Sequence, residues 1–260
     1  MEKMARVGLI SKGITYCLTG ALALMAALHV GNSQSSDADK TGVFSFLEDQ
    51  PMGTPLLLLL ALGLLCYACW RAIQCFGDTE NKGSDLKGWG HRAAYLFSGI
   101  IYLFLAFLAG RMALGQSTGG GGDNRVKLAS ELMEHSYGQI IAGIIAIMLI
   151  GYGFMQFRKV FSGKYKKDVQ EGQYRHPDAS KWILRAGRIG YSARGIVWLI
   201  IGWLFLKAAV KGSPNEAGDT GKVFQWIEAG PFGSIMLGLV AAGLVCYGIF
   251  MFVRAAYQKV

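Results

Sequence analysis

The sequence has few charged side chains. Asp, Glu, Lys and Arg make up 17% of its 260 residues, whereas a typical soluble domain has about 25%. Hydrophobic residues make up 52%, and the mean hydropathy is +0.33. This composition disfavours a soluble globular domain and predicts a membrane protein.

Charge is missing altogether from five long blocks. Each block is close in length to the roughly 20 residues of helix that cross a bilayer core. Backbone groups cannot stay unpaired in lipid, so only helices or closed barrels remain, and the blocks lack the alternation of barrel strands. Five spanning helices are therefore predicted, at 13–30, 53–70, 93–110, 137–157 and 229–253.

A sixth apolar block is shorter, because Arg194 and Lys207 bound it. Their separation corresponds to roughly 20 Å of helix rise. Long basic side chains at such positions can extend to opposite membrane interfaces. Residues 188–210 are therefore predicted to form a further span, which brings the total to six.

Acidic side chains and catalytic motifs are missing from the predicted spans. Proton relays and cation-coupled carriers need ionisable groups within the membrane. Intramembrane metalloproteases need a motif such as His-Glu-x-x-His. We therefore expect a non-enzymatic protein without metal or cofactor. An enzyme acting on a lipid-borne substrate is a less favoured class.

Cysteine is scarce and confined to apolar blocks, which disfavours a disulfide framework. Cys66 and Cys69 share a helical face, as metal ligands can. No His or carboxylate accompanies them, so apolar packing is the favoured interpretation. The five cysteines are Cys17, Cys66, Cys69, Cys75 and Cys246.

Internal repetition is the most informative feature present. Residues 6–28 align without gaps on 188–210, and residues 51–74 align on 231–254. A weaker middle copy keeps Arg92 and Tyr152 at matching positions. Because the basic N-terminal pattern recurs deep within the chain, we expect the first helix to be retained rather than cleaved as a signal peptide.

The repeats predict an all-α polytopic membrane protein. Three tandem hairpins of two spanning helices occupy 1–78, 79–162 and 188–260, and a basic linker occupies 163–187. Direct repeats of this kind predict a pseudo-threefold arrangement about the membrane normal. A Gly- and Ser-rich connector joins the two helices of each hairpin.

Each connector ends in a short amphipathic segment, predicted to be a helix at the membrane interface. The glycine run 119–122 lacks the residues of a phosphate-binding loop. The apolar positions are Val43, Phe44, Phe46 and Leu47 in the first connector, Val126, Leu128, Leu132 and Met133 in the second, and Val223, Phe224, Trp226 and Ile227 in the third.

Glycines recur at fixed spacing in the outer first helices. Small residues let membrane helices approach closely, so these glycines are predicted to lie at helix–helix contacts. They are Gly8, Gly13 and Gly20, repeated as Gly190, Gly195 and Gly202.

Tyr67, Tyr152 and Tyr247 occupy one equivalent position in the three second helices. A Tyr hydroxyl within the bilayer needs a partner. The favoured interpretation is a bond to a backbone carbonyl or a neighbouring Ser or Thr. The alternative is a central polar ring around a ligand or pore. Three further aromatic residues recur at one position of the first helices, and they could join that ring or anchor their helices at the membrane interface. They are Tyr16, Tyr102 and Trp198.

These features resemble a bacterial integral membrane family catalogued as domain of unknown function twelve-oh-six. The resemblance rests on Arg6-x-Gly8 and its copy Arg188-x-Gly190, on a basic residue before Gly13 and Gly195, and on Pro-x-Gly before the outer second helices. The middle repeat departs from all three patterns. The resemblance implies a tandem two-helix repeat, and it implies no activity.

Basic residues are distributed unevenly about the six predicted spans. All but seven of the 26 Lys and Arg residues lie on the side of the termini. The positive-inside rule therefore predicts cytoplasmic termini in a bacterial inner membrane. The basic linker is expected to bind anionic lipid rather than nucleic acid. Its basic residues and those flanking it are Arg158, Lys159, Lys164, Lys166, Lys167, Arg175, Lys181, Arg185 and Arg188.

The sequence thus predicts a structural or accessory membrane protein that interacts with lipid or with a partner. The alternative is a passive pathway or binding pocket for a small solute along the pseudo-threefold axis. An open axis would favour the pathway, whereas a filled axis with an exposed apolar face would favour partner binding.

Single cysteines introduced along the chain test the predicted topology. Because basic residues are retained in the cytoplasm, positions within 164–181 should react with an impermeant thiol reagent only after the cells are opened. Positions within 32–40, 116–124 and 212–220 should react in intact spheroplasts. Labelling of 164–181 from outside would refute the charge argument.

Overall fold

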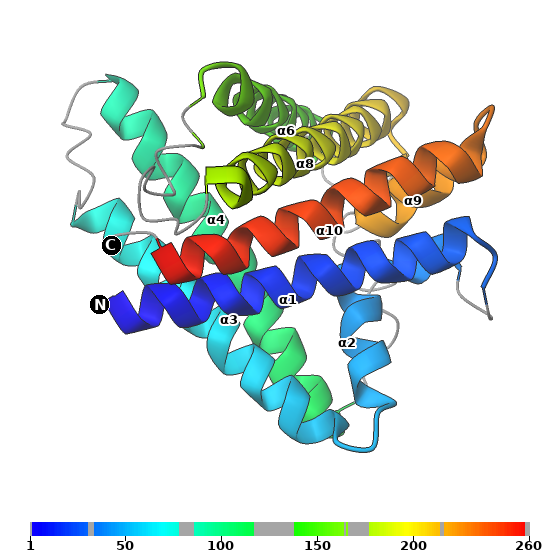
Figure 1. Cartoon of the computed structure of the whole chain (residues 1–260). Helices are drawn as coiled ribbons and strands as arrows, with labels where there is room; N and C mark the ends of the chain where they lie inside the picture. The colour runs from blue at the N-terminus through cyan, green and yellow to red at the C-terminus, as the bar shows by residue number, and fades with distance from the viewer. Residues whose placement is uncertain are drawn as a thin grey trace. The chain divides into compact units, whose positions relative to one another are not determined.

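The computed structural model describes residues 2–30, 34–77, 86–116, 138–163, 165, 177–213 and 216–257, and all its regular elements in these ranges are helical. Six of the helices are long and apolar enough to cross a membrane, which confirms the predicted all-α class. They are α1 (Glu2–Ala27), α3 (Gly53–Phe76), α4 (Leu86–Ala113), α6 (Gly138–Phe161), α8 (Pro177–Lys211) and α10 (Gly233–Tyr257) (Figure 1).

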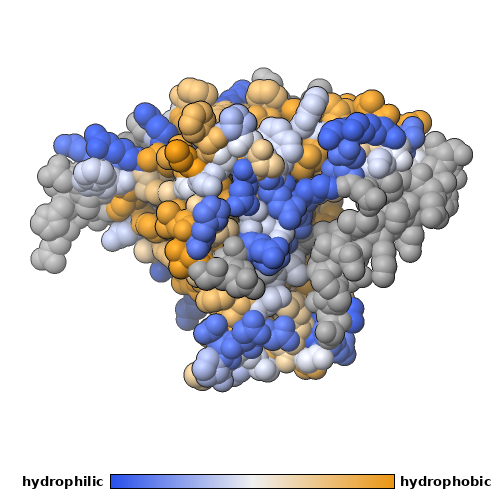
Figure 2. Space-filling model, turned by 90° about the vertical axis from the view of Figure 1, so that its right-hand side faces the viewer, coloured by the Kyte–Doolittle hydropathy of each residue, from blue (hydrophilic) through white to orange (hydrophobic). Residues whose placement is uncertain are grey.

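The long helices expose large apolar side chains near their middles. Leu59 of α3, Ile147 of α6 and Leu239 of α10 are each about two-thirds exposed. Figure 2 shows one face of the molecule, where apolar side chains lie beside hydrophilic ones. Exposed apolar surface of this kind is expected where lipid replaces water as the solvent.

The chain forms two compact units. One contains residues 1–15, 44–118 and 251–260, and the other contains 16–43 and 119–250. In the first unit α3 packs along α4, and in the second α6 packs along α8. Each of these pairs joins the second helix of one predicted repeat to the first helix of the next.

Glycines bring the two helices of each outer hairpin into backbone contact. A Cβ atom on Gly8 of α1 would lie 2.7 Å from the Cα of Tyr67 on α3. In the second unit, a Cβ on Gly190 of α8 would lie 2.5 Å from the Cα of Tyr247 on α10. The first and third repeats therefore share one mode of packing within the hairpin.

The remaining predicted glycines are also buried. A Cβ on Gly20 would lie 2.7 Å from the carbonyl oxygen of Ala241, at the place where α1 and α10 run side by side (Figure 1). The corresponding atoms on Gly195 and Gly202 would meet side chains of α6. Gly13 is buried as well. Substitution at Gly8 and Gly190 tests the packing role below.

Short helices occupy the described connectors. In the first, a 3-10 turn η1 (Ser35–Asp37) precedes α2 (Lys40–Glu48), and the third contains α9 (Thr220–Glu228). Asp39 accepts a hydrogen bond from the Gly42 amide, and Asp219 accepts one from the Lys222 amide, so both helices have an Asp cap at the same repeat position. The predicted segment of the second connector lies outside the described residues.

Helix α8 begins earlier than the sequence analysis predicted. It starts at Pro177, within the segment expected to be linker, and so includes Lys181 and Arg185 of that segment. Proline is favourable at the first position of a helix, and no proline follows within α8. The hydropathy pattern marked only the apolar part of this helix. Most of the remaining linker, 166–176, lies outside the described residues.

Alanine substitution tests the backbone contacts. Gly8→Ala and Gly190→Ala should each lower the free energy of unfolding by ~1–3 kcal/mol, because overpacking outweighs the gain of up to ~1 kcal/mol in helix propensity. Gly151→Ala on α6 is the matched control, since its Cβ would meet nothing within 4 Å. Thermal unfolding in detergent measures the difference. Equal stability of Gly190→Ala and Gly151→Ala would contradict the packing described.

Candidate functional site

Tyr67 accepts hydrogen bonds from two basic side chains in the first unit. Its side chain is 1% exposed. The Lys12 Nζ donates to its hydroxyl oxygen at 2.9 Å, and Arg71 donates from Nε at 2.9 Å and from Nη2 at 2.6 Å. Gly8 makes this geometry possible, because α1 can approach the Tyr67 backbone only without a side chain there.

Aromatic rings surround the Lys12 ammonium group. Lys12 is 2% exposed, and its Nζ lies 4.7 Å from the ring centroid of Tyr67 and 5.2 Å from that of Tyr102. A desolvated cation over an aromatic face gains about 2 kcal/mol. Arg71 also donates to the Gln74 amide oxygen at 2.8 Å. The cluster is therefore a network rather than one bond.

Arg194 forms the corresponding cluster in the second unit. It is 4% exposed although it lies well within α8. Nη1 donates to the Tyr247 hydroxyl at 2.6 Å, and Nη2 donates to the Tyr152 hydroxyl at 3.0 Å. Its guanidinium carbon also lies 5.4 Å from the Tyr16 ring centroid. One guanidinium thus joins α8 to both α6 and α10.

The two clusters occupy equivalent repeat positions. Lys12 and Arg194 align in the first helices, as Tyr67 and Tyr247 do in the second helices. The middle repeat has Ser98 in place of the cation. Its Tyr152 instead accepts its hydrogen bond from Arg194, which belongs to the next repeat. The departure of the middle repeat from the family pattern is therefore compensated by its neighbour.

An edge-to-face aromatic contact recurs at three junctions between repeats. In each, the second-helix tyrosine meets the aromatic residue of a first helix. The ring centroids lie 4.6 Å apart for Tyr67 and Tyr102, 5.1 Å for Tyr152 and Trp198, and 4.8 Å for Tyr247 and Tyr16. In the last pair the third repeat meets the first. A pseudo-threefold arrangement requires this cyclic order, and the arrangement itself stays a prediction.

Two sequence-based interpretations need correction. The Arg194 side chain does not extend outward from the helices, because it is 4% exposed and donates to the hydroxyls of Tyr247 and Tyr152. Tyr16 and Tyr102 are buried against other rings, so they are not interfacial anchors.

The structure brings together part of the predicted tyrosine ring. Tyr152 and Tyr247 share Arg194, whereas Tyr67 lies in the other unit with Lys12 and Arg71. A ring of all three stays a hypothesis. The sequence analysis missed the basic partners. The signal that could have found them was the alignment of Lys12 with Arg194, one basic residue retained inside two equivalent spans.

The geometry of the clusters suits cohesion between helices. A cation removed from water is costly unless hydrogen bonds compensate it, and tyrosine hydroxyls and ring faces supply that compensation here. Among the residues that the structure describes, no group of His, Cys, Asp or Glu could hold a metal ion. The basic side chains of the clusters donate hydrogen bonds to oxygen atoms, and the acceptors described are tyrosine hydroxyls and the Gln74 amide oxygen.

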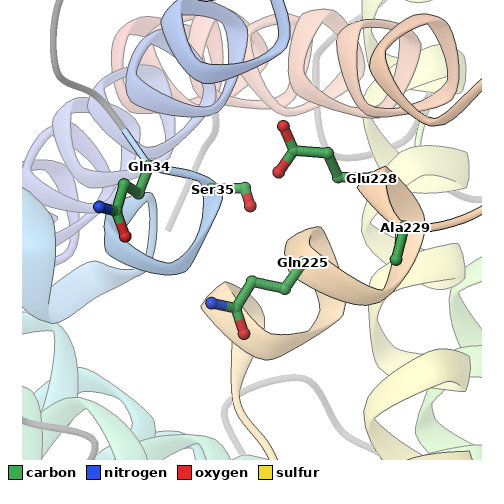
Figure 3. Close-up of a pocket in the computed structure, with 5 residues that line it drawn as sticks. All are labelled: Gln34, Ser35, Gln225, Glu228 and Ala229. Carbon is green, nitrogen blue, oxygen red and sulfur yellow. The ribbon is translucent and has the colours of Figure 1, made fainter.

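A separate polar pocket lies at the connector end of the second unit. It has a volume of about 420 Å³ and lies between η1 and α9. Figure 3 shows polar side chains from both elements around it. The lining residues are Gln34, Ser35, Gln225, Glu228 and Ala229.

Comparison with known proteins supports the repeat. A sequence model of the family described as Domain of Unknown Function (DUF1206) matches residues 7–77, 93–163 and 189–258. The chain is 26% identical over 262 residues to the Uncharacterized protein YxxB of Bacillus subtilis (strain 168), covering 99% of this chain and 91% of that protein. No solved structure matches the chain. The three matches confirm the three tandem repeats and the resemblance.

Tyr→Phe substitutions test the shared guanidinium. Tyr152→Phe and Tyr247→Phe should each cost ~1.5–3 kcal/mol of stability, the usual range for a hydrogen bond to a charged group. Their effects should be coupled by at least ~0.5 kcal/mol, because both remove partners of Arg194. Tyr67→Phe should add independently to either. Strict additivity of the Tyr152 and Tyr247 variants in thermal unfolding would show that the guanidinium does not link them.

Proposed function

We propose that this chain, which belongs to the family described as Domain of Unknown Function (DUF1206), is a non-enzymatic accessory protein of the bacterial inner membrane that interacts with lipid. The observation that carries the proposal is that the buried basic side chains bind other helices of the same chain. Lys12 and Arg194 donate to tyrosines of neighbouring helices, so the polar chemistry of the spans serves cohesion.

Exposed tryptophan side chains lie beside arginines near the N-terminal ends of α4 and α8. Trp182 of α8 is 67% exposed, and the Arg185 guanidinium lies 5.1 Å from its ring centroid. On α4, Arg92 lies 5.8 Å from the ring of the exposed Trp89. Tryptophan prefers the headgroup layer, and arginine binds phosphate. These pairs support interaction with anionic phospholipid.

The same end of the second unit carries further positive charge. Helix α6 ends with Arg158 and Lys159 in its last turn, and Lys159 donates to Tyr191 of α8 at 3.1 Å. On α8, the side chains of Arg185 and Arg188 are also exposed. We propose that this basic end faces the cytoplasm, where anionic lipid attracts it and the positive-inside rule retains it.

The connector end of the second unit differs in charge. Lys207 and Lys211 pair with Glu216 at 2.9 and 3.0 Å. Their hydrogen bonds lower the pKa of the Glu216 carboxyl to about 2, so it stays ionised at physiological pH. The Glu216 carboxylate offsets one of these two positive charges, which supports an assignment of this end to the periplasmic side.

A second candidate function is the binding or passive passage of a small solute. The observation that favours it is the pocket of about 420 Å³ at the connector end. Its volume falls within the range of small-molecule sites. Because this pocket lies between η1 and α9, it supports the binding of a solute, and passage along the axis stays a hypothesis.

Lipid-dependent stability tests the first function. In nanodiscs, replacing phosphatidylcholine with phosphatidylglycerol should raise the melting temperature, since each basic group near an anionic surface contributes ~1 kcal/mol. Arg158→Gln with Arg185→Gln should remove a large part of this gain. Lys207→Gln with Lys211→Gln removes the same charge from the opposite end and should leave most of the gain intact. Equal loss in both double variants would contradict lipid binding at the basic end.

A further inference from the structure

The connector-end pocket is rich in hydrogen-bond acceptors. Gln34 and Gln225 each offer an amide oxygen, Ser35 offers a hydroxyl, and Glu228 offers a carboxylate. Figure 3 shows the Ser35 hydroxyl and the Glu228 carboxylate turned toward the same open space, with the two glutamine side chains at its edge. Among the described lining residues, Glu228 carries the one ionisable group, and it is acidic.

Helix α9 adds a second source of negative potential. It ends at Glu228, and the backbone N–H of the capping Ala229 is bonded within the last turn, to the carbonyls of Gln225 and Ile227. The C-terminus of a helix carries roughly half a negative charge. Glu228 and Ala229 both line the pocket, so a carboxylate and the end of a helix lie beside it, and both favour a cation.

A close backbone contact holds the pocket walls together, and a helix cap fixes the start of α9. The α-carbon of Gly221 in α9 packs so closely on the Ser36 carbonyl that no side chain fits between them. At the start of α9, Asp219 caps the helix through the Lys222 amide at 3.1 Å. Because η1 and α9 come from the first and third repeats, the pocket exists only when these two connectors are packed together.

The pocket lies close to the expected level of lipid headgroups. Helix α9 ends at Glu228, and only a short turn separates it from Gly233, where the membrane-spanning α10 begins. The neighbouring Trp226 is exposed, as aromatic residues at membrane interfaces commonly are. Both a dissolved solute and the headgroup of a lipid can reach such a position.

We propose that this pocket binds a primary ammonium group. The inference rests on the second candidate function and names its ligand class. An R–NH₃⁺ group carries one positive charge and three N–H donors. The carboxylate of Glu228 matches the charge, and the amide and hydroxyl oxygens of Gln34, Gln225 and Ser35 match the donors. A quaternary ammonium group carries the charge without the donors, so it binds more weakly.

Titration calorimetry with ethanolamine tests the proposal on the intact protein in phosphatidylcholine nanodiscs. Wild type should bind ethanolamine, and Glu228→Gln should weaken binding on the order of tenfold, since it removes a charged hydrogen bond. Gln225→Ala should weaken it less. Glu48→Gln is the matched control, because Glu48 is the exposed repeat equivalent of Glu228 on α2 and does not line the pocket. Choline should bind several-fold more weakly than ethanolamine.

A second arm distinguishes the source of the ammonium group. If the natural occupant is a phosphatidylethanolamine headgroup, nanodiscs made with that lipid should abolish ethanolamine binding to wild type. If the occupant is a free amine, binding should be the same in both lipids. Either result supports an ammonium site. Equal binding of ethanolamine by wild type and Glu228→Gln would overturn it, and so would the lack of binding in phosphatidylcholine.

An uncharged solute distinguishes a specific ammonium site from a pocket that binds small solutes in general. Ethylene glycol binding that Gln225→Ala weakens and Glu228→Gln leaves unchanged would overturn the ammonium site while supporting a solute pocket. The anionic-lipid test at the opposite end of the helices is independent of both results.

Discussion

A positive charge inside a membrane span must be hydrogen-bonded, and the rest of this structure is arranged around that requirement. Lys12 and Arg194 are both buried, and both donate to the hydroxyl of a tyrosine on the adjacent helix. Without such partners, each charge would cost several kcal/mol. The position of one basic residue in the first helix thereby determines which residue the second helix must present opposite it.

Close backbone contact is the condition for these bonds. Gly8 and Gly190 lie one helical turn before Lys12 and Arg194, against the backbones of Tyr67 and Tyr247. Without a side chain at the glycine, the helices approach closely enough for the cation to meet the hydroxyl. The glycine, the basic residue and the tyrosine therefore act together as one three-residue motif. The first and third repeats contain all three residues of this motif. The middle repeat keeps its tyrosine, whose hydroxyl accepts a hydrogen bond from Arg194 of the third repeat.

Sequence patterns predicted the elements of this fold better than its contacts. The six spans and three repeats followed from apolar blocks and alignments, because both are properties of consecutive residues. The start of α8 did not follow, since charged residues interrupt the apolar ones within 177–187, although this segment is helical. The tyrosines were recognised as equivalent, but their partners were missed. A hydrogen bond between Arg194 and Tyr152 joins different repeats, and no local pattern contains it.

Double-mutant cycles between the basic residues and the tyrosines measure the central interaction most directly. Arg194→Met with Tyr247→Phe, and Lys12→Met with Tyr67→Phe, can be followed by thermal unfolding in detergent. The hydrogen bonds described here predict a coupling energy of ~1.5–3 kcal/mol in each cycle. Coupling below ~0.5 kcal/mol in both cycles would show that the buried cations and tyrosines do not hold the helices together.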